Sequence, residues 1–206
     1  KRVRKMKILI LTDIHEDYTA AISAHEIERP EIVLDCGDHH EIKNLFGQTP
    51  HFYIYGNHEP ENVSLDILCS PTKIIGGAIY EFERDNNRIS FAGLDGNYSH
   101  SFSLYSVGEK EVEGLKIIPS GKLDILLVHE SPLNANCSIE YVPQVISEIE
   151  RIRPKFVFAG HSGKYSEDLI RGEIKIITLD NIVKGYGLLN ITKNKATFQR
   201  KIARYR

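Results

Sequence analysis

The chain has 206 residues, of which 41% are hydrophobic and 26% charged, and this balance allows one domain to bury a full core without disulfides or metals. Its formal net charge is −2, so it lacks the overall positive field with which proteins bind long nucleic-acid duplexes. Its apolar runs are strand-length, well short of the roughly 20 residues that span a bilayer, and no apolar segment of a secretory signal follows the basic start.

The three cysteines have no CxxC spacing, which fits a reducing compartment, and the abundance of isoleucine with little Gln hints at a heat-adapted source. We therefore expect a single cytoplasmic domain over residues 1–206, in which residues 1–5 are a basic extension ahead of Met6.

The first half of the chain alternates apolar runs with amphipathic stretches. Buried strands are predicted over residues 7–12, 31–35 and 51–55, and a helix over 17–28. Strands and helices at this spacing are typical of βαβ units, which build a parallel sheet.

The second half is richer in strands. After strands predicted over 73–75, 78–83 and 88–93, a polar loop runs from Asp95 to about Gly114. A strand over 123–128, a helix near 141–152 and a strand over 155–159 restore the alternation. An antiparallel meander is expected over 166–170, 173–178, 185–191 and 195–202. The pattern predicts an α/β fold, a four-layer α/β/β/α sandwich of two mixed β-sheets flanked by helices.

Polar side chains come directly after five of the predicted strands. They are Asp13 and His15, Asp38, Asn57 and His58, His129, and His161. Each has an ordinary explanation by itself, such as a helix cap, a tight turn or a structural histidine. Because the carboxyl ends of strands meet at one edge of an α/β sheet, the conjunction instead indicates a common site.

Carboxylate, amide and imidazole ligands suit divalent cations such as Mn²⁺, Fe²⁺, Zn²⁺ or Ni²⁺. A carboxylate has two oxygens and can bridge two ions, and Asp38 is placed for that role. Two ions about 3.5–4 Å apart clamp a phosphoryl group and lower the pKa of a bridging water, so that hydroxide attacks in line. The residues thus predict a hydrolase that acts on phosphoesters.

The order of these motifs resembles that of the calcineurin-like metallophosphoesterases. The motifs are Asp13-x-His15, Gly37-Asp38, Gly56-Asn57-His58-Glu59, His129 after a strand, and Gly160-His161. The resemblance covers about residues 7–165, and the compact length is similar to that of the small, uncapped phosphodiesterase-type members.

The resemblance implies a role for each matching position. Asp13 and His15 would hold a first metal ion, Asp38 would bridge, and the second ion would be held by Asn57, His129 and His161. His58 would bind no metal. It would instead lie beside the leaving-group oxygen and assist catalysis by donating a proton or steadying charge, so that His58 and Asp38 are the expected catalytic residues.

One position departs from the family pattern. The second histidine of the family's Gly-His-x-His motif is Gly163 here, which cannot ligate and weakens the first metal site. His39 and His40, directly after Asp38, are candidates to compensate there or to contact phosphate, and Lys164 is a candidate to balance phosphate charge. All three have a plainer explanation as surface or pocket-lining residues.

A long aromatic loop over residues 95–106 contains Tyr98 and His100. Long loops without structure of their own frequently border sites, so these two residues are candidates for substrate selection, against the alternative of a packed surface loop.

Two other functions stay open at this point. A relative with a degenerate metal pocket can serve as a scaffold that binds partner proteins, and Gly163 favours that hypothesis. Nuclease action is the other, favoured by a basic C-terminal end (Lys193, Lys195, Arg200, Lys201, Arg204, Arg206) and disfavoured by the overall charge. We expect a small phosphoester substrate, no membrane partner, and an exposed sheet edge as a seam for a homodimer.

Overall fold

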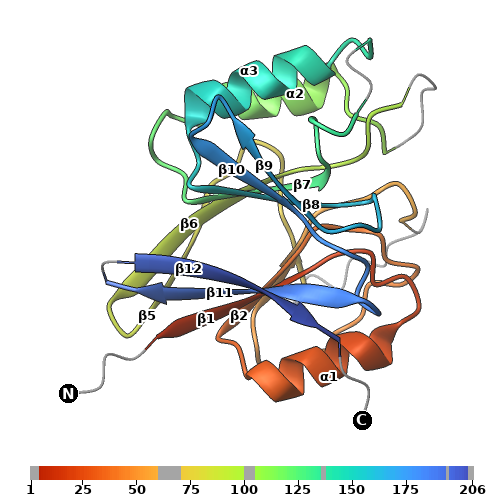
Figure 1. The fold of residues 1–206 in the computed structure, drawn as a ribbon, viewed down its shortest axis with the longest axis vertical. Coiled ribbons are helices and arrows are strands. Elements are labelled where there is room, and N and C mark those ends of the chain that lie inside the picture. The colour runs from red at the N-terminus through yellow and green to blue at the C-terminus, as the bar shows by residue number, and fades with distance from the viewer. Residues whose placement is uncertain (1–4, 60–70, 100–104, 136–137, 194, 204–206) are drawn as a thin grey trace.

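Two six-stranded sheets form the centre of the protein in a computed structural model that describes residues 5–59, 71–99, 105–135, 138–193 and 195–203. Helix α1 covers the outer face of one sheet, and α2 and α3 cover the outer face of the other (Figure 1). The predicted four-layer sandwich is therefore confirmed.

The first sheet has the order β12-β11-β1-β2-β3-β4. Its strands are β1 (Met6–Leu11), β2 (Ile32–Asp35), β3 (His51–Tyr53), β4 (Thr72–Lys73), β11 (Gly185–Thr192) and β12 (Lys195–Ile202). Strands β1 to β4 run parallel, whereas β11 and β12 form an antiparallel hairpin against β1. Helix α1 (Tyr18–Glu28) makes the crossover from β1 to β2.

The second sheet has the order β5-β6-β7-β8-β10-β9. Its strands are β5 (Tyr80–Arg84), β6 (Asn87–Leu94), β7 (Ile125–Glu130), β8 (Phe156–Gly160), β9 (Ser166–Ile170) and β10 (Ile174–Thr178). The four central strands run parallel, and β5 and β9 are antiparallel edges. Helices α2 (Glu109–Lys116) and α3 (Val142–Ile152) connect the parallel strands.

Strand β1 shows why the layers form. Ile8 and Ile10 point into the core between the two sheets, while Leu9 and Leu11 point to the layer beneath α1. Successive side chains of a strand face opposite sides, so an unbroken apolar run suits a strand that is buried on both faces. Among the described residues, no helix is long and apolar enough to cross a bilayer.

Two expectations about the second half were wrong. The last four strands do not form one meander, because β9 and β10 belong to the second sheet and β11 and β12 to the first. The predicted loop from Asp95 to Gly114 contains the start of α2, which is short and includes Gly114. Helix α2 is supported from outside, since the Arg151 guanidinium of α3 donates to the carbonyls of Leu115 and Ile118 at its C-terminal end.

Candidate metal centre

The turns that follow the parallel strands of both sheets meet at one edge. His161, after β8, donates its main-chain N–H to Asp13 Oδ2 at 2.9 Å, which joins the second sheet to the end of β1. Asn57 and His58, after β3, donate their main-chain N–H groups to Asp38 Oδ1 at 2.8 and 2.9 Å. The predicted site residues are therefore neighbours in space, although they are far apart in the chain.

The backbone is strained at four of these positions. Asp13, His15, Asp38 and His161 have φ values of 50°, 48°, 69° and 64°, in the left-handed region that residues with a Cβ avoid. Each such residue costs about 1–2 kcal/mol and persists only where the surroundings hold it in place. Strain gathered in this way is characteristic of functional sites, where it aims side chains that a relaxed turn would direct elsewhere.

Two glycines allow the β2 and β3 turns to touch. A Cβ on Gly37, which has a φ of 96°, would lie 2.4 Å from the main-chain nitrogen of Gly56. A Cβ on Gly56 would lie 2.1 Å from Asp38 Oδ1 and 2.7 Å from His129 Cε1. Both glycines are therefore needed for close approach of the turns that present Asp38 and Asn57.

One group of possible ligands surrounds His129, which is fully buried and lies where the β7–β8 register shifts. Its Nδ1–H donates to the carbonyl of Cys36 at 2.8 Å, so Nε2 is free to use its lone pair in the neutral ring. Nε2 lies 2.9 Å from Asn57 Oδ1, 3.2 Å from His161 Nδ1 and 3.4 Å from Asp38 Oδ1. Imidazole nitrogens, an amide oxygen and a carboxylate oxygen thus gather at one place, and this donor set fits a divalent metal ion.

A second group consists of Asp13, His15 and Asp38, whose ligand atoms lie within 4.8 Å of one another. Thr12 Oγ1–H donates to Asp13 Oδ2 at 2.6 Å and orients that carboxylate. His15 Nε2 lies 4.0 Å from Asp38 Oδ2, the oxygen that the main-chain amides leave unused. Asp38 belongs to both groups, and it offers a different oxygen to each.

The two groups share an electrostatic pairing. Burial opposes the charge on Asp38, but the hydrogen bond and charge of His129, with the amide of His58, outweigh it and lower the pKa of the carboxyl. Burial likewise opposes the charged form of His129, and Asp38 raises its pKa overall. Asp38 is therefore ionised at neutral pH, as a metal ligand must be.

The model of the calcineurin-like phosphoesterase family matches residues 6–165, which include every position of both groups. The chain belongs to this family. Membership makes it a metal-dependent phosphoesterase, a hydrolase that acts on ester bonds. A search of curated proteins found no match.

Solved structures of other proteins share the fold at low sequence identity. A dimetal phosphatase from Danio rerio is 14% identical with a TM-score of 0.64, and the match covers 96% of each chain. A phosphatase from Mycoplasma pneumoniae is 11% identical with a TM-score of 0.59, covering 98% of this chain and 95% of that one. GAP50, the anchor in the inner membrane complex of Plasmodium, is 10% identical with a TM-score of 0.65, covering 96% and 84%.

Two exposed histidines of this phosphoesterase stand beside the first group. The ring of His58 lies 5.7 Å from that of His15, and the ring of His40 lies 5.5 Å from it. Both side chains are exposed and have ring nitrogens within reach of a molecule arriving from solvent. The structure thus brings His58 and His40 to the rim of the predicted site.

Other predicted substrate residues lie elsewhere. His39 is buried, and both of its ring nitrogens face carboxylates, so a substrate has no access to it. Tyr98 is packed in the core beneath α2 and α3, because its loop folds inward at the bridge between Asn97 and Ser106. Neither fits the role of binding substrate, and His100 lies outside the described residues. Lys164 is exposed, three residues after His161.

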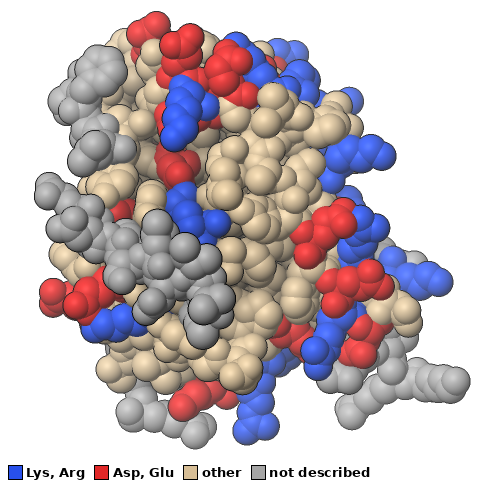
Figure 2. All heavy atoms as spheres, turned by 180° about the vertical axis from the view of Figure 1, so that it is seen from behind, with Lys and Arg blue, Asp and Glu red and all other residues tan. Residues whose placement is uncertain are grey.

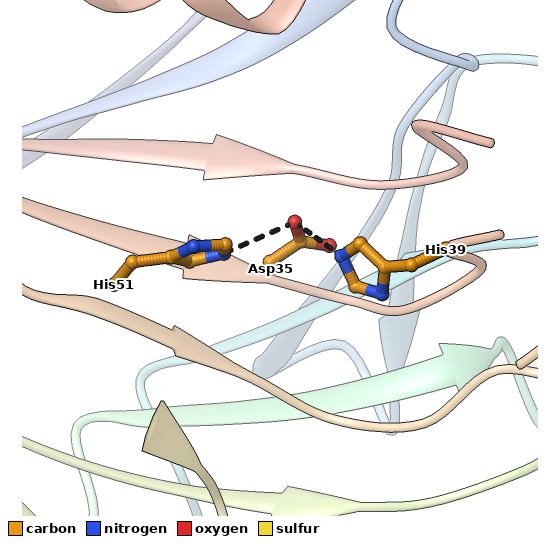
Figure 3. Close-up of side chains that lie close together, drawn as sticks. All are labelled: Asp35, His39 and His51. Carbon is orange, nitrogen blue, oxygen red and sulfur yellow. Dashed lines mark hydrogen bonds and ion pairs between the residues drawn. The ribbon is translucent and has the colours of Figure 1, made fainter. Parts of the chain in front are cut away.

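A polar cluster that was not predicted from the sequence lies behind the metal groups. It consists of Asp35, His39 and His51, which Figure 3 shows, together with Glu59. Asp35 was the sequence feature that could have revealed this cluster, because it is a carboxylate at the end of the apolar strand β2 and is fully buried there. A charge in such a position requires partners.

Proposed function

We propose that this phosphoesterase binds two divalent metal ions and hydrolyses small phosphoesters, with Asp38 as the shared ligand. The observation that carries the proposal is that Asp38 directs one oxygen toward His129 at 3.4 Å and the other toward His15 at 4.0 Å. A single buried carboxylate between two sets of nitrogen and oxygen donors is the arrangement expected for a bridging ligand. Mn²⁺, Fe²⁺, Zn²⁺ and Ni²⁺ all suit such donors.

Each side chain has a distinct part in this proposal. Asp13 and His15 would hold the first ion with Asp38, and Asn57, His129 and His161 the second. The bound ions would supply charge for a phosphoryl group and a hydroxide at neutral pH. His58, exposed beside His15, is placed to hydrogen-bond a leaving-group oxygen and give it a proton. His40, also exposed beside His15, is placed to contact the rest of the substrate.

The distribution of charge favours a small substrate over a nucleic-acid polymer. On the face seen in Figure 2, Lys and Arg side chains are interspersed with Asp and Glu around a broad uncharged area. Lys193 and Lys195 lie at the β11–β12 hairpin, next to the start of β1 and therefore at the sheet edge opposite the metal groups. Arg200 is already paired with Asp180. A continuous basic track to the site, as nucleases use, is not formed by these residues.

A second candidate function is a scaffold that binds partner proteins. Gly163, in place of the family's last histidine, leaves the first group with three ligands, and GAP50 shows that the fold also occurs in a protein that serves as an anchor. The four other strand-end turns retain their ligands, together with a rim histidine that a scaffold does not need. We therefore favour the enzyme.

The test is hydrolysis of bis-p-nitrophenyl phosphate and p-nitrophenyl phosphate by metal-stripped protein titrated in turn with Mn²⁺, Fe²⁺, Zn²⁺ and Ni²⁺. Asp38→Ala removes the shared ligand and should abolish metal-dependent turnover. Asp168→Ala, at the outer edge strand β9 where the carboxylate bonds only to Ser166 among the described residues, is the matched control and should retain it. Turnover that persists in Asp38→Ala refutes the shared-ligand proposal. If neither substrate is hydrolysed with any of the four metals, the enzyme hypothesis is refuted and the scaffold is favoured.

A further inference from the structure

Four ionisable side chains form a buried cluster directly behind the metal groups. Asp35 ends β2 and His51 begins β3, while His39 and Glu59 belong to the turns that follow these two strands. Their exposed fractions are 0% for Asp35, 3% for each histidine and 7% for Glu59. Ionisable groups buried to this extent are expensive unless they satisfy one another, so the partners of each group decide whether its burial is tolerated.

His39 lies between the two carboxylates. Its Nε2 is 2.9 Å from Asp35 Oδ2, and its Nδ1 is 3.3 Å from Glu59 Oε1. Ionised carboxylates only accept hydrogen bonds, so both ring nitrogens donate and the ring is an imidazolium. His39 is thus a cation that connects the end of β2 to the turn after β3 (Figure 3 shows the Asp35 side).

Glu59 also accepts hydrogen bonds from the turns that present the candidate metal ligands. Its Oε1 accepts the main-chain N–H of Asp38 at 2.7 Å and that of Gly56 at 2.8 Å. Its Oε2 accepts the main-chain N–H of His39 at 3.3 Å. One carboxylate therefore fixes both the turn that presents Asp38 and the turn that presents Asn57.

A third metal site is the other chemistry that Asp35, His39 and His51 suggest, and the ring geometry argues against it. The rings of His39 and His51 are 6.4 Å apart between centroids, compared with 5.1 Å for His129 and His161. In Figure 3 the Asp35 carboxylate lies between the two rings, which approach it from opposite sides. Two imidazoles that share a tetrahedral ion would lie closer together, as His129 and His161 do.

We infer that His39 is a positioning residue: it holds Glu59 against Asp35, and Glu59 in turn holds the main chain of Asp38 and Gly56 so that both metal groups keep their geometry. The inference rests on the proposed function for its consequence, which is metal affinity, but the positioning itself is a property of the metal-free chain. Outer partners of this kind typically change metal affinity by about 10–100-fold when they are removed.

The experiment compares His39→Gln with His25→Gln. His25 lies on α1, is a member of neither metal group, bonds to Thr49 Oγ1 at 2.9 Å and stacks on Phe46. Its replacement therefore also removes one histidine and one side-chain hydrogen bond, together with one ring contact. The first readout is amide hydrogen exchange of the metal-free proteins. We expect His39→Gln to accelerate exchange selectively at Asp38 and Gly56, and His25→Gln to leave both unchanged relative to β1. Exchange that rises uniformly in His39→Gln would overturn the inference.

The second readout is Mn²⁺ affinity by calorimetry. His39→Gln should weaken binding about 10–100-fold while His25→Gln does not. Glu59→Gln keeps the shape and one acceptor oxygen, and serves if His39→Gln fails to fold. Where both single variants fold, the double variant His39→Gln/Glu59→Gln should lose less Mn²⁺ affinity than the product of the two single losses, because each substitution breaks the same contact between His39 and Glu59. Unchanged affinity in both single variants overturns the inference. Wild-type protein that binds Mn²⁺ but hydrolyses nothing contradicts the proposed function and leaves the exchange result to decide the positioning role.

Discussion

The close approach of the β2 and β3 turns predicts a strong effect from adding one methyl group at Gly56. In Gly56→Ala the new Cβ would lie 2.1 Å from Asp38 Oδ1, 2.7 Å from the main-chain nitrogen of Asp38 and 2.7 Å from His129 Cε1. Two of these neighbours are candidate metal ligands, and the third is main chain held by Glu59. None of them is the loose end of a flexible side chain that can turn aside.

The size of the effect follows from these distances. Ordinary van der Waals contact begins at 3.4 Å, so Asp38 Oδ1 must withdraw by about 1.3 Å or the turns must separate by a similar amount. Overpacking of this kind costs about 1–3 kcal/mol in the free energy of unfolding. A misplacement of about 1 Å at a reacting centre lowers the rate by about 10²-fold. We expect both losses in Gly56→Ala.

The assay measures kcat with bis-p-nitrophenyl phosphate at saturating Mn²⁺, Mn²⁺ affinity, and urea unfolding without metal. Gly76→Ala is the matched control, because among the described residues nothing lies within 4 Å of its Cβ position. The control should resemble the wild type in all three measurements. If Gly56→Ala also has wild-type affinity and turnover, the turns are not packed as described and the reasoning is refuted.

Three further predictions concern the site and the cluster behind it. His58→Ala should keep its metal content and lose about 10²–10⁴-fold in kcat, whereas loss of metal would make His58 a ligand. Gly163→His should tighten binding of a second Mn²⁺ ion in calorimetry, because the nearest described atom to its Cβ is Lys184 Nζ at 3.9 Å. The φ of 61° at this position makes a side chain there cost about 1–2 kcal/mol in the free energy of unfolding, so the urea stability of the metal-free variant is measured alongside. Unchanged stoichiometry and affinity in a folded variant would contradict the weakened first site. Burial opposes the charge of Asp35, but the charge and hydrogen bond of His39 outweigh burial and lower the pKa of Asp35 below its ordinary value of 3.8. The ionised Asp35 therefore stabilises the fold above about pH 4, and this stabilisation is lost as the pH falls. Asp35→Asn should therefore flatten the acid side of the urea-stability profile below about pH 4, and an identical slope in both proteins would exclude this role.

Several structural features were predictable because they depend on local pattern. The unbroken apolar run of β1 and the polar residues directly after it identify a buried strand that ends at a site. The same reasoning applies to β2, β3, β7 and β8, so the sandwich and the convergence of ligands were both within reach of the sequence. Helix α2 was not, because its eight residues include a glycine and depend on Arg151 of α3 for support at their end.

The chemistry of the site follows from the residue types at the ends of the strands, which can be read without any structure: oxygen and nitrogen ligands for divalent ions, and a histidine beside them. The different surroundings of neighbouring histidines are visible only in the folded chain. His39 and His40 are adjacent in sequence, but His39 is buried between Asp35 and Glu59, whereas His40 is exposed beside His15. The chain is extended at His39, which forms a β-bridge with His15, and successive side chains of an extended segment face opposite sides. Which side is buried depends on Glu59, which the turn after β3 brings beside His39, and no local pattern around His39 contains that information.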